Sequence, residues 1–326
     1  MDRVLWGSTM IVALGTFLTA ALFLATADLW WPATLLLFGP RWVLLAPVAA
    51  LVAVAAWRDR LLLAPLTLSA GVVVGPIMGL ETGWRTWATR GDPDADITIV
   101  TFNAAGRAPA RDPRALMEAW GADVAAVQEC SRDTGSALRD LDGWHVASGR
   151  TQCLVSRFEI LERRDMEREA LEIAGGAGLV ASYRLAGPTG PFWLTSVHLE
   201  TPRDGLALIR YGNPLEGLRV LRQKGLLRAI ELRQAEHFAS GAAGPHIAVG
   251  DFNTPPESRL YRAAWGGWTN AFSVAGLGFG RTRLNGWIRA RIDHVVVDGS
   301  WRVVDARLGE DVGSDHLPLI AVVRLR

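Results

Sequence analysis

Apolar residues dominate the first eighty positions of the chain, in runs that only a few charges interrupt. One run extends from Val4 to Ala27, a second lies within residues 33–57 and starts near Trp42, and a third spans about 61–80. At 1.5 Å per residue, a helix as long as the first run crosses about 30 Å of hydrocarbon. A cleaved signal peptide would account for the first run alone, and its apolar core is shorter. The pattern predicts three transmembrane helices, with charges only at the breaks: Asp2, Arg3, Asp28, Arg41, Arg58, Asp59 and Arg60.

The ends of these runs indicate how the helices cross the membrane. Seven of the fourteen tryptophans lie there, where an amphipathic ring prefers the headgroup level. With the N-terminus in the cytoplasm, the nearby arginines divide three against three, so their count decides nothing. The tight turn Arg58-Asp59-Arg60 favours that orientation. Three spans then place the residues after 90 outside a bacterial-type inner (cell) membrane.

Beyond Gly91 the pattern changes to short apolar runs that alternate with helical periodicity. The stretch 91–94 (GDPD) is a turn-rich linker, so we expect a membrane region and linker at 1–90 and one α/β or α+β domain at 91–326. Strands are predicted at 97–102, 123–128, 192–199, 246–252 and 292–297. A long amphipathic helix is predicted at 214–240, with one face formed by Leu215, Leu218, Leu221, Leu226 and Ile230.

Composition removes several classes of protein. The chain has 326 residues, half of them hydrophobic, and a formal net charge of +1, so it is neither a basic coat protein nor disordered. Two cysteines, Cys130 and Cys153, exclude a disulfide-dense scaffold and a four-cysteine zinc site. They could form one disulfide if their strands are neighbours, or remain two buried thiols. With Lys224 as the one lysine and no CxxC motif, redox, Schiff-base and thiol chemistry have no residue set.

Several of the predicted strands end in a polar residue that can bind a metal or move a proton. Each taken alone has a plain structural explanation, such as a turn asparagine or a surface glutamate. Asp251 and Asn253 are two apart, so they point to the same side of an extended chain. Together the strand ends predict a phosphoester-cleaving site: oxygen ligands suit Mg²⁺ or Mn²⁺, and a histidine held by a carboxylate can deprotonate water. The set is Asn103, Glu129, His198, Asp251, Asn253, Asp293, Asp315 and His316.

The ordered blocks N, QE, HLE, GDFN, RIDH and GSDH resemble the endonuclease/exonuclease/phosphatase superfamily over residues 97–326. The resemblance implies a four-layer sandwich of two packed mixed β-sheets flanked by helices, with the site at one end. It implies that Glu129 is the principal metal ligand, beside Asn103, and that Asp315 is an additional metal-side carboxylate. His316 would be the general base or phosphate-contacting histidine, oriented by Asp293, while Asp251 and Asn253 position the water and the phosphoryl oxygens. His198 matches the HL block of the deoxyribonuclease and sphingomyelinase branches, which abasic-site endonucleases replace.

The substrate is less constrained than the reaction, which is a Mg²⁺-dependent attack of water on phosphorus. Residues 91–326 carry 28 Lys and Arg against 29 Asp and Glu, without the basic excess of a typical duplex-binding nuclease. The predicted membrane anchor favours a lipid-linked phosphoester or pyrophosphate, because tethering raises the effective concentration of lipid phosphates. A nuclease, an enzyme for a soluble phosphoester, and a non-catalytic binding protein are the alternatives. No protein partner can be inferred. Arg281 and Arg283 either contact substrate phosphates or are solvated loop residues.

Overall fold

The computed structural model describes residues 2–83, 96–107, 112–139, 141–285 and 288–326. Two compact units form: Met1–Leu80 together with Glu257–Arg259, and Glu81–Pro256 together with Leu260–Arg326. The predicted linker at 91–94, and the tryptophans Trp84 and Trp87, lie outside the described residues.

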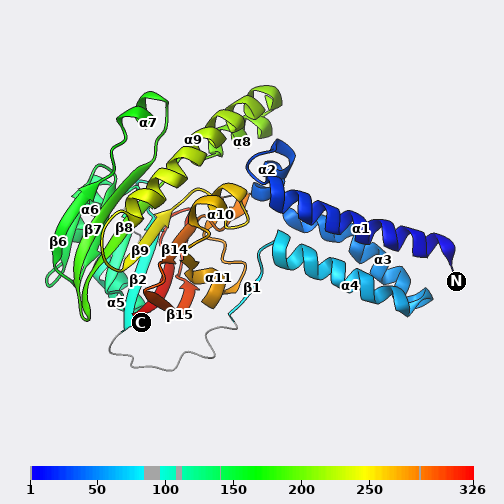
Figure 1. Cartoon of the computed structure of the whole chain (residues 1–326), viewed down its shortest axis with the longest axis horizontal. Helices are drawn as coiled ribbons and strands as arrows, with labels where there is room; N and C mark the ends of the chain where they lie inside the picture. Colours follow the sequence, from blue (N-terminus) through cyan, green and yellow to red (C-terminus); the bar gives the residue numbers. More distant parts are fainter. Residues whose placement is uncertain (1, 84–95, 108–111, 140, 286–287) are drawn as a thin grey trace. The chain divides into compact units, whose positions relative to one another are not determined.

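The first unit is helical (Figure 1). It holds three stretches that are long and apolar enough to cross a membrane, Arg3–Thr26, Arg41–Arg58 and Arg60–Ile77. Side chains on their outer surfaces are apolar as well, since Ile11, Leu14 and Trp57 are all exposed. The elements are α1 (Arg3–Thr26), α2 (Trp31–Phe38), η1 (Arg41–Leu44), α3 (Leu45–Arg58), η2 (Arg60–Leu62), α4 (Leu63–Val72) and η3 (Val73–Ile77).

Among the described residues of this helical unit, two charged ones are buried, Arg41 and Asp28. Arg41 donates from Nη1 to the carbonyl of Ile77 (2.7 Å), and its Nε and Nη2 donate to the carbonyl of Leu37. Its Nη1 also lies 3.0 Å from Glu257 Oε2, and Ser258 Oγ is 2.6 Å from Asp28 Oδ2. A buried charge must be paired and hydrogen-bonded to be tolerated, and these contacts meet that need. Arg41 is therefore part of the packing of this unit rather than a solvated loop arginine.

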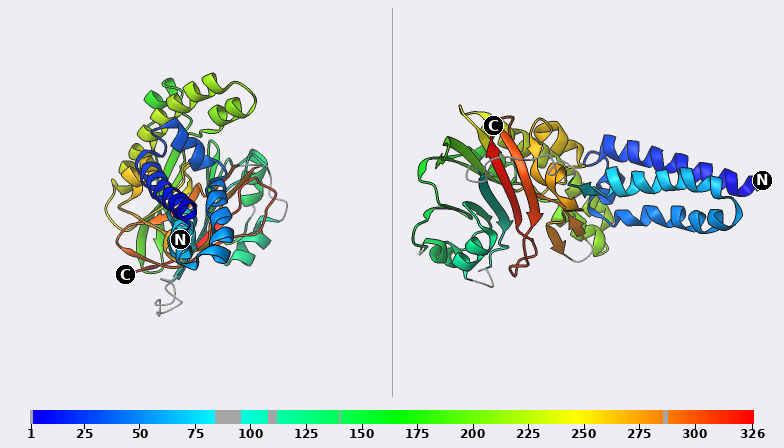
Figure 2. Two further views of the ribbon diagram at one scale, coloured as in Figure 1. Left: turned by 90° about the vertical axis from the view of Figure 1, so that its right-hand side faces the viewer. Right: turned by 90° about the horizontal axis from the view of Figure 1, so that it is seen from below.

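The second unit is built on two six-stranded mixed sheets (Figure 2). Within each sheet one neighbouring pair is parallel, β2 with β3 and β8 with β9, and the other pairs are antiparallel. The order in the first sheet is β15 (Trp301–Leu308), β16 (Leu319–Leu325), β2 (Asp96–Asn103), β3 (Val124–Gln128), β5 (Gln152–Ser156) and β4 (His145–Gly149). The order in the second is β10 (Thr269–Asn270), β14 (Asp293–Val297), β9 (His246–Asp251), β8 (Gly190–His198), β7 (Leu179–Gly187) and β6 (Ile160–Asp165).

The two sheets pack face to face, and helices cover both outer faces. Ile99 and Leu154 of one sheet meet Leu194, Val249 and Val295 of the other in a dry inner core. The outer faces are covered by α5 (Pro113–Trp120) and α6 (Arg132–Arg139) on one side, and by α9 (Pro214–Ser240) and α10 (Arg259–Trp265) on the other. The predicted four-layer sandwich is confirmed. The remaining elements are β1 (Glu81–Thr82), α7 (Glu169–Ile173), α8 (Arg203–Arg210), α11 (Ala271–Ala275), β11 (Leu277–Gly278), β12 (Arg283–Asn285) and β13 (Ile288–Ala290).

Helix α9 spans the predicted residues, but the predicted buried face is wrong. Leu215 is 82% exposed and Leu226 is 64% exposed. The buried positions include Leu221 together with two charged residues, Arg228 and Glu231. The position of the leucines predicted the wrong face because this helix buries two charged residues, one of which, Glu231, accepts backbone hydrogen bonds. A search for apolar periodicity counts such residues as exposed.

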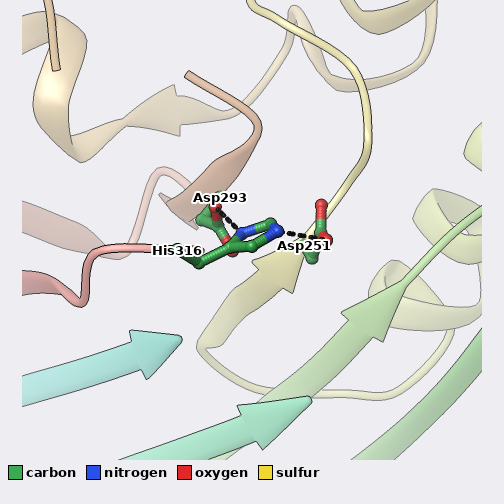
Figure 3. Close-up of side chains that lie close together, drawn as sticks. All are labelled: Asp251, Asp293 and His316. Atoms are coloured by element: carbon green, nitrogen blue, oxygen red, sulfur yellow. Dashed lines mark hydrogen bonds and ion pairs between the residues drawn. The ribbon is translucent and has the colours of Figure 1, made fainter. Parts of the chain in front are cut away.

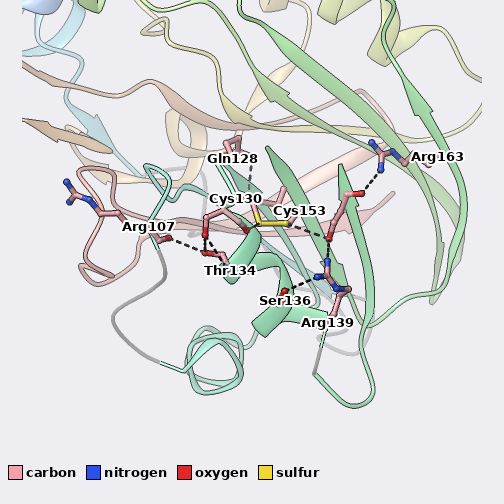
Figure 4. The surroundings of a disulfide bond; sticks show 11 residues. Arg107, Gln128, Cys130, Thr134, Ser136, Arg139, Cys153 and Arg163 are labelled. Carbon is pink, nitrogen blue, oxygen red and sulfur yellow. Dashed lines mark hydrogen bonds between the residues drawn. A yellow bond between two sulfur atoms is a disulfide. The ribbon is translucent and has the colours of Figure 1, made fainter. Parts of the chain in front are cut away.

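The two cysteines form a disulfide between neighbouring strands (Figure 4). Strands β3 and β5 pair antiparallel, with Val127 opposite Cys153, so Cys130 lies just beyond the paired region. The Cα atoms of Cys130 and Cys153 are 5.9 Å apart, within the range that a disulfide needs. Of the two alternatives that the sequence left open, the structure contains the disulfide.

Candidate active site

Strand ends from both sheets meet at one edge of the sandwich. In the first sheet Asn103 pairs with Gln128, so Glu129 follows directly beside it. In the second sheet Asp251 lies between His198 on one neighbouring strand and Asp293 on the other. The amide of Asn103 joins the two sheets, because its Nδ2 donates to Asp251 Oδ2 at 3.1 Å.

His316 occupies the centre of this edge, between two buried carboxylates (Figure 3). Its Nδ1 lies 2.8 Å from Asp293 Oδ2, and its Nε2 lies 3.8 Å from Asp251 Oδ2. All three side chains are buried. Thr282 Oγ1 accepts the backbone N–H groups of Ile292 and Asp293, which fixes the start of strand β14 and the carboxylate that it carries.

Arg283 is the fourth group around the ring. Its Nη1 lies 2.7 Å from His316 Nε2, and its Nη2 lies 2.6 Å from Asp315 Oδ2. A guanidinium has no acceptor, so Nε2 must accept here and Nδ1 must carry the proton that it donates to Asp293. When the imidazole is neutral, these contacts therefore hold it in one defined tautomer.

The same ring has a strong tendency to take up a second proton. Burial alone would lower the pKa of His316, but the carboxylates of Asp293 and Asp251 outweigh it and raise the pKa to about 9, against the opposing guanidinium of Arg283. A proton added at Nε2 would have to displace the Arg283 donor from that atom. Proton uptake by His316 and release of Arg283 are thus linked in this geometry.

Glu129, Asn103 and His198 form the more open side of the edge. Asn103 Nδ2 donates to Glu129 Oε1 at 3.0 Å, and His198 Nε2 lies 3.7 Å from the same oxygen. The side chain of Glu129 is 39% exposed, in contrast to the buried Asp251 and Asp293. Ser314 Oγ donates to the backbone carbonyl of Asn103 at 2.6 Å, which attaches the turn before His316 to this side.

The backbone is strained at residues of this edge. Glu129 and Asn253 have φ values of 47° and 48°, a left-handed conformation that non-glycine residues seldom adopt. The side chain of Asp251 accepts the backbone N–H of Asn253 at 2.9 Å, and Asn253 Nδ2 donates to the carbonyl of Leu199 at 2.8 Å. Gly250 also has a positive φ, and a Cβ there would collide with the carbonyl of Val197 on the adjacent strand. Such strain persists where surrounding contacts enforce it, and it concentrates at functional sites.

Comparison with known proteins decides the family of this domain. Residues 100–316, two thirds of the chain, match the model of the Endonuclease/Exonuclease/phosphatase family. The chain belongs to this family. Members of the family are metal-dependent phosphoesterases and nucleases, hydrolases that act on phosphoesters. Among proteins with curated descriptions, no sequence matches the chain.

Solved structures agree on the fold. A humanized D. rerio TDP2 carrying 14 mutations matches with a TM-score of 0.55 and 14% identity, covering 71% of this chain and 99% of that one. D. rerio TDP2 complexed with a single-strand DNA product also matches with a TM-score of 0.55, at 15% identity, covering 71% of this chain and 100% of that one. At these identities the likeness concerns the fold alone.

A divalent cation, as family members use, fits the charge of the site. The contact network contains four carboxylates, those of Glu129, Asp251, Asp293 and Asp315. The basic groups that contact them are Arg283, His198 and His316. Burial raises the pKa of Asp251, and the like charge of Asp293 raises it further, a crowding that a bound cation relieves. Among the described residues, Asp293 Oδ1 is buried without a hydrogen-bond partner.

Within the described part of the chain, one trio offers ligand atoms within 4.8 Å of one another: Asp251, Asp293 and His316. The sequence placed the ion instead at Glu129, Asn103 and Asp315. In the structure Asn103 turns its amide nitrogen to the carboxylates and its oxygen to the N–H of Ala105, and Asp315 is paired with Arg283. Glu129 is exposed enough to bind an ion that keeps several of its waters, so its role as the principal ligand stays a prediction.

All eight residues of the predicted set are thus linked by a chain of contacts at one edge of the sandwich. Arg283 lies within this network, whereas the contact found for Arg281 is with the ring of Phe279, 4.8 Å away. His294, the residue after Asp293, is buried on the opposite face of β14, where it contacts Asn270 and the carbonyl of Thr254. Sequence reasoning missed Thr282 and Ser314, although Ser314 stands inside the GSDH block next to the residues that were chosen.

Proposed function

We propose that this protein is a divalent-metal-dependent phosphoester hydrolase tethered to a membrane. The observation that carries the proposal is the buried Asp293–His316–Asp251 arrangement, with Glu129 and Asn103 directly beside it. A histidine held in one tautomer by a carboxylate, next to acidic groups that suit a cation, is the equipment for attack of water on phosphorus.

In this proposal His316 acts through Nε2, the ring atom that is not bonded to Asp293. Asp293 keeps the proton on Nδ1, and Nε2 takes a proton from, or gives one to, the reacting groups when Arg283 moves aside. Arg283 then contacts a phosphoryl oxygen, because its guanidinium matches that geometry. Asp251 aligns the water, while Asn253 supports it through the backbone contacts described above. A bound Mg²⁺ or Mn²⁺, held through Glu129, would neutralise the charge that develops on the phosphoryl oxygens.

The favoured substrate class is a lipid-linked phosphoester or pyrophosphate. Three apolar stretches with exposed apolar surfaces support a membrane tether, and the Cys130–Cys153 disulfide supports an oxidising, extracytoplasmic compartment. The formal charge of residues 91–326, about −1, gives no general attraction to a polyanion. A nuclease is the second candidate, favoured by the likeness in fold to the TDP2 structure that holds a DNA product.

The test is hydrolysis by the purified full chain in detergent, with Mg²⁺ and with EDTA. The panel contains a long-chain prenyl diphosphate, a phospholipid, a soluble phosphomonoester and single-stranded and plasmid DNA. We expect Mg²⁺-dependent release from a lipid substrate. If DNA were the only substrate cleaved, the nuclease hypothesis would replace the lipid hypothesis. Absence of hydrolysis with every member of the panel would overturn the enzymatic proposal.

Matched variants connect that activity to the site. Glu129→Ala should lower turnover by about 100-fold or more, because it removes the proposed metal ligand. Glu118→Ala is its control, since Glu118 is exposed on helix α5 and away from the contact network. Equal activity of the two variants would show that hydrolysis does not depend on Glu129.

A further inference from the structure

A cavity of about 420 Å³ lies next to the strand ends of the candidate site. Three arginines line it, Arg150, Arg163 and Arg168, against two carboxylates, Asp165 and Glu167, of which Asp165 pairs with Arg163 and Glu167 accepts the backbone N–H groups of Arg168 and Glu169. Gln152 and Leu179 are also part of the lining. We refer to it below as the arginine cavity.

The strand register places the arginine cavity directly beside the site. Gln152 pairs with Gln128, the residue before Glu129, and Leu179 pairs with His198. Gln152 Nε2 donates to the carbonyl of Leu179 at 3.0 Å, which joins the two sheets at this point. The cavity therefore begins one residue beyond the Glu129–His198 side, the more open side of the site.

The hydrogen bonds that these arginines make to the protein do not use all of their N–H donors. Arg163 donates to the carbonyl of Ser148 and to Asp165, at 3.0 and 2.7 Å. Arg168 makes a long contact of 3.4 Å to the carbonyl of Gly176, and its Nε is buried without a hydrogen-bond partner among the described residues. A guanidinium has five N–H donors, so the cavity has donors to offer a ligand.

The carboxylate of Glu172 is loosely associated with two of these arginines. It lies 3.9 Å from Arg150 Nη1 and 3.8 Å from Arg168 Nη1, too far for hydrogen bonds to either. Its side chain is 57% exposed and so is free to leave. Such a loose, exposed ion pair contributes little stability, and an incoming oxyanion with three acceptor oxygens can replace it.

We propose that the arginine cavity binds a second anionic group of the substrate, a phosphate several bonds away from the phosphorus that is attacked. The inference rests on the proposed function, since the cavity adjoins that site. It makes the substrate class narrower: a phosphoester that carries a further phosphate group several bonds from the first, rather than a simple monoester.

The test uses two chromogenic substrates that differ by one phosphate, thymidine 5′-(p-nitrophenyl phosphate) with and without a 3′-phosphate. For the full-length protein we expect KM to be about tenfold lower with the second phosphate. Arg168→Met should remove at least fivefold of that preference and leave the kinetics of the single-phosphate substrate unchanged. Arg150→Met should act in the same direction.

Glu172→Gln provides a change of opposite sign. It removes the carboxylate charge that competes with the second phosphate for the arginines. The KM of the substrate with two phosphates should therefore fall further, while the KM of the single-phosphate substrate stays the same. Equal KM values for the two substrates, or unchanged preference in all three variants, would overturn this inference while the proposed function stands. If the wild-type protein hydrolyses neither substrate nor any member of the panel above, the proposed function fails instead.

Discussion

At the scale of single residues, His316 shows how the surroundings of one ring set its chemistry. Asp293 fixes the tautomer from one side, and Arg283 and Asp251 compete for the other nitrogen. Burial would lower the pKa of the ring, yet the two carboxylates raise it to about 9. The Nε2 atom of His316 can therefore accept either a hydrogen bond from Arg283 or a proton.

Asp293→Asn tests the tautomer. An asparagine can present its N–H₂ to the ring, which favours a proton on Nε2 and leaves no acceptor there for the reaction. We expect kcat to fall by about 10²- to 10⁴-fold, the range that a lost general acid or base produces, with the fold intact by circular dichroism. The matched control is Asp204→Asn, because Asp204 is exposed; this variant should retain wild-type kcat. Asp298→Asn would be unsuitable as a control, because Asp298 accepts the backbone N–H of His246.

The raised pKa of His316 also predicts how stability depends on pH. The unfolded histidine titrates near 6.5 and the folded one near 9, so the folded state holds the proton more tightly. Its contribution is complete below pH 6.5 and is lost as the pH rises through about 9. EDTA-treated wild-type protein should show a thermal midpoint that falls over this interval more steeply than that of His316→Gln. Parallel curves for the two proteins would contradict the raised pKa.

At the scale of elements, helix α9 supports the site from behind. Glu231 is fully buried and accepts the backbone N–H of Glu200 at 2.6 Å and that of Gly178 at 3.0 Å. These residues follow His198 at the end of β8 and precede Leu179 at the start of β7. Gly176 and Gly178 make room for the carboxylate, since a Cβ at either would press on it. The burial of a charge on α9 thus holds together the two strand ends beside His198.

Glu231→Ala should be destabilising, because it leaves two buried backbone N–H groups without their acceptor, at a cost of about 1–3 kcal/mol each. Burial raises the pKa of Glu231, so part of this loss is offset by the relief of desolvation. Chemical denaturation should show a drop of about 2 kcal/mol or more in the free energy of unfolding. Glu236 is unsuitable as a control, since it is half-buried and accepts a hydrogen bond from Trp268 Nε1. Glu169 is exposed on α7, so Glu169→Ala should leave stability unchanged.

The elements also show what a sequence can and cannot predict here. The strands that lead to the site, and the meeting of the eight residues at one edge, could be predicted, because an apolar run followed by a metal-competent residue is a local pattern. The buried face of α9 could not, because Arg228 and Glu231 read as surface residues until their partners are known. Thr282 supports Asp293 across eleven positions of sequence, and the Cys130–Cys153 bond depends on the pairing of β3 with β5. These features arise from contacts that no local pattern carries.

At the scale of the whole molecule, the chain contains an apolar helical unit and a domain with a disulfide. Three candidate spans with a cytoplasmic N-terminus would export the domain that follows them, and an exported domain can keep the Cys130–Cys153 bond. With the cytoplasmic N-terminus that the sequence predicts, the three spans and the disulfide agree on an extracytoplasmic domain.

Sidedness can be measured with reporter fusions at residue 96, where the domain begins. Alkaline phosphatase fused there should be active, since it needs an oxidising compartment, and a cytoplasm-dependent fluorophore at the same point should remain dark. The reverse result would place the domain in the cytoplasm and remove the compartment on which the disulfide depends.

The central claim is that the ring of His316, between Asp293 and Asp251, hydrolyses a phosphoester. The most direct measurement compares wild-type protein with His316→Ala, at equal concentration in Mg²⁺, for release of p-nitrophenol from thymidine 5′-(p-nitrophenyl phosphate). The account predicts wild-type release that EDTA abolishes, and a loss of about 100-fold or more in the variant, with His237→Ala unaffected. Full activity in the folded His316→Ala variant would contradict it.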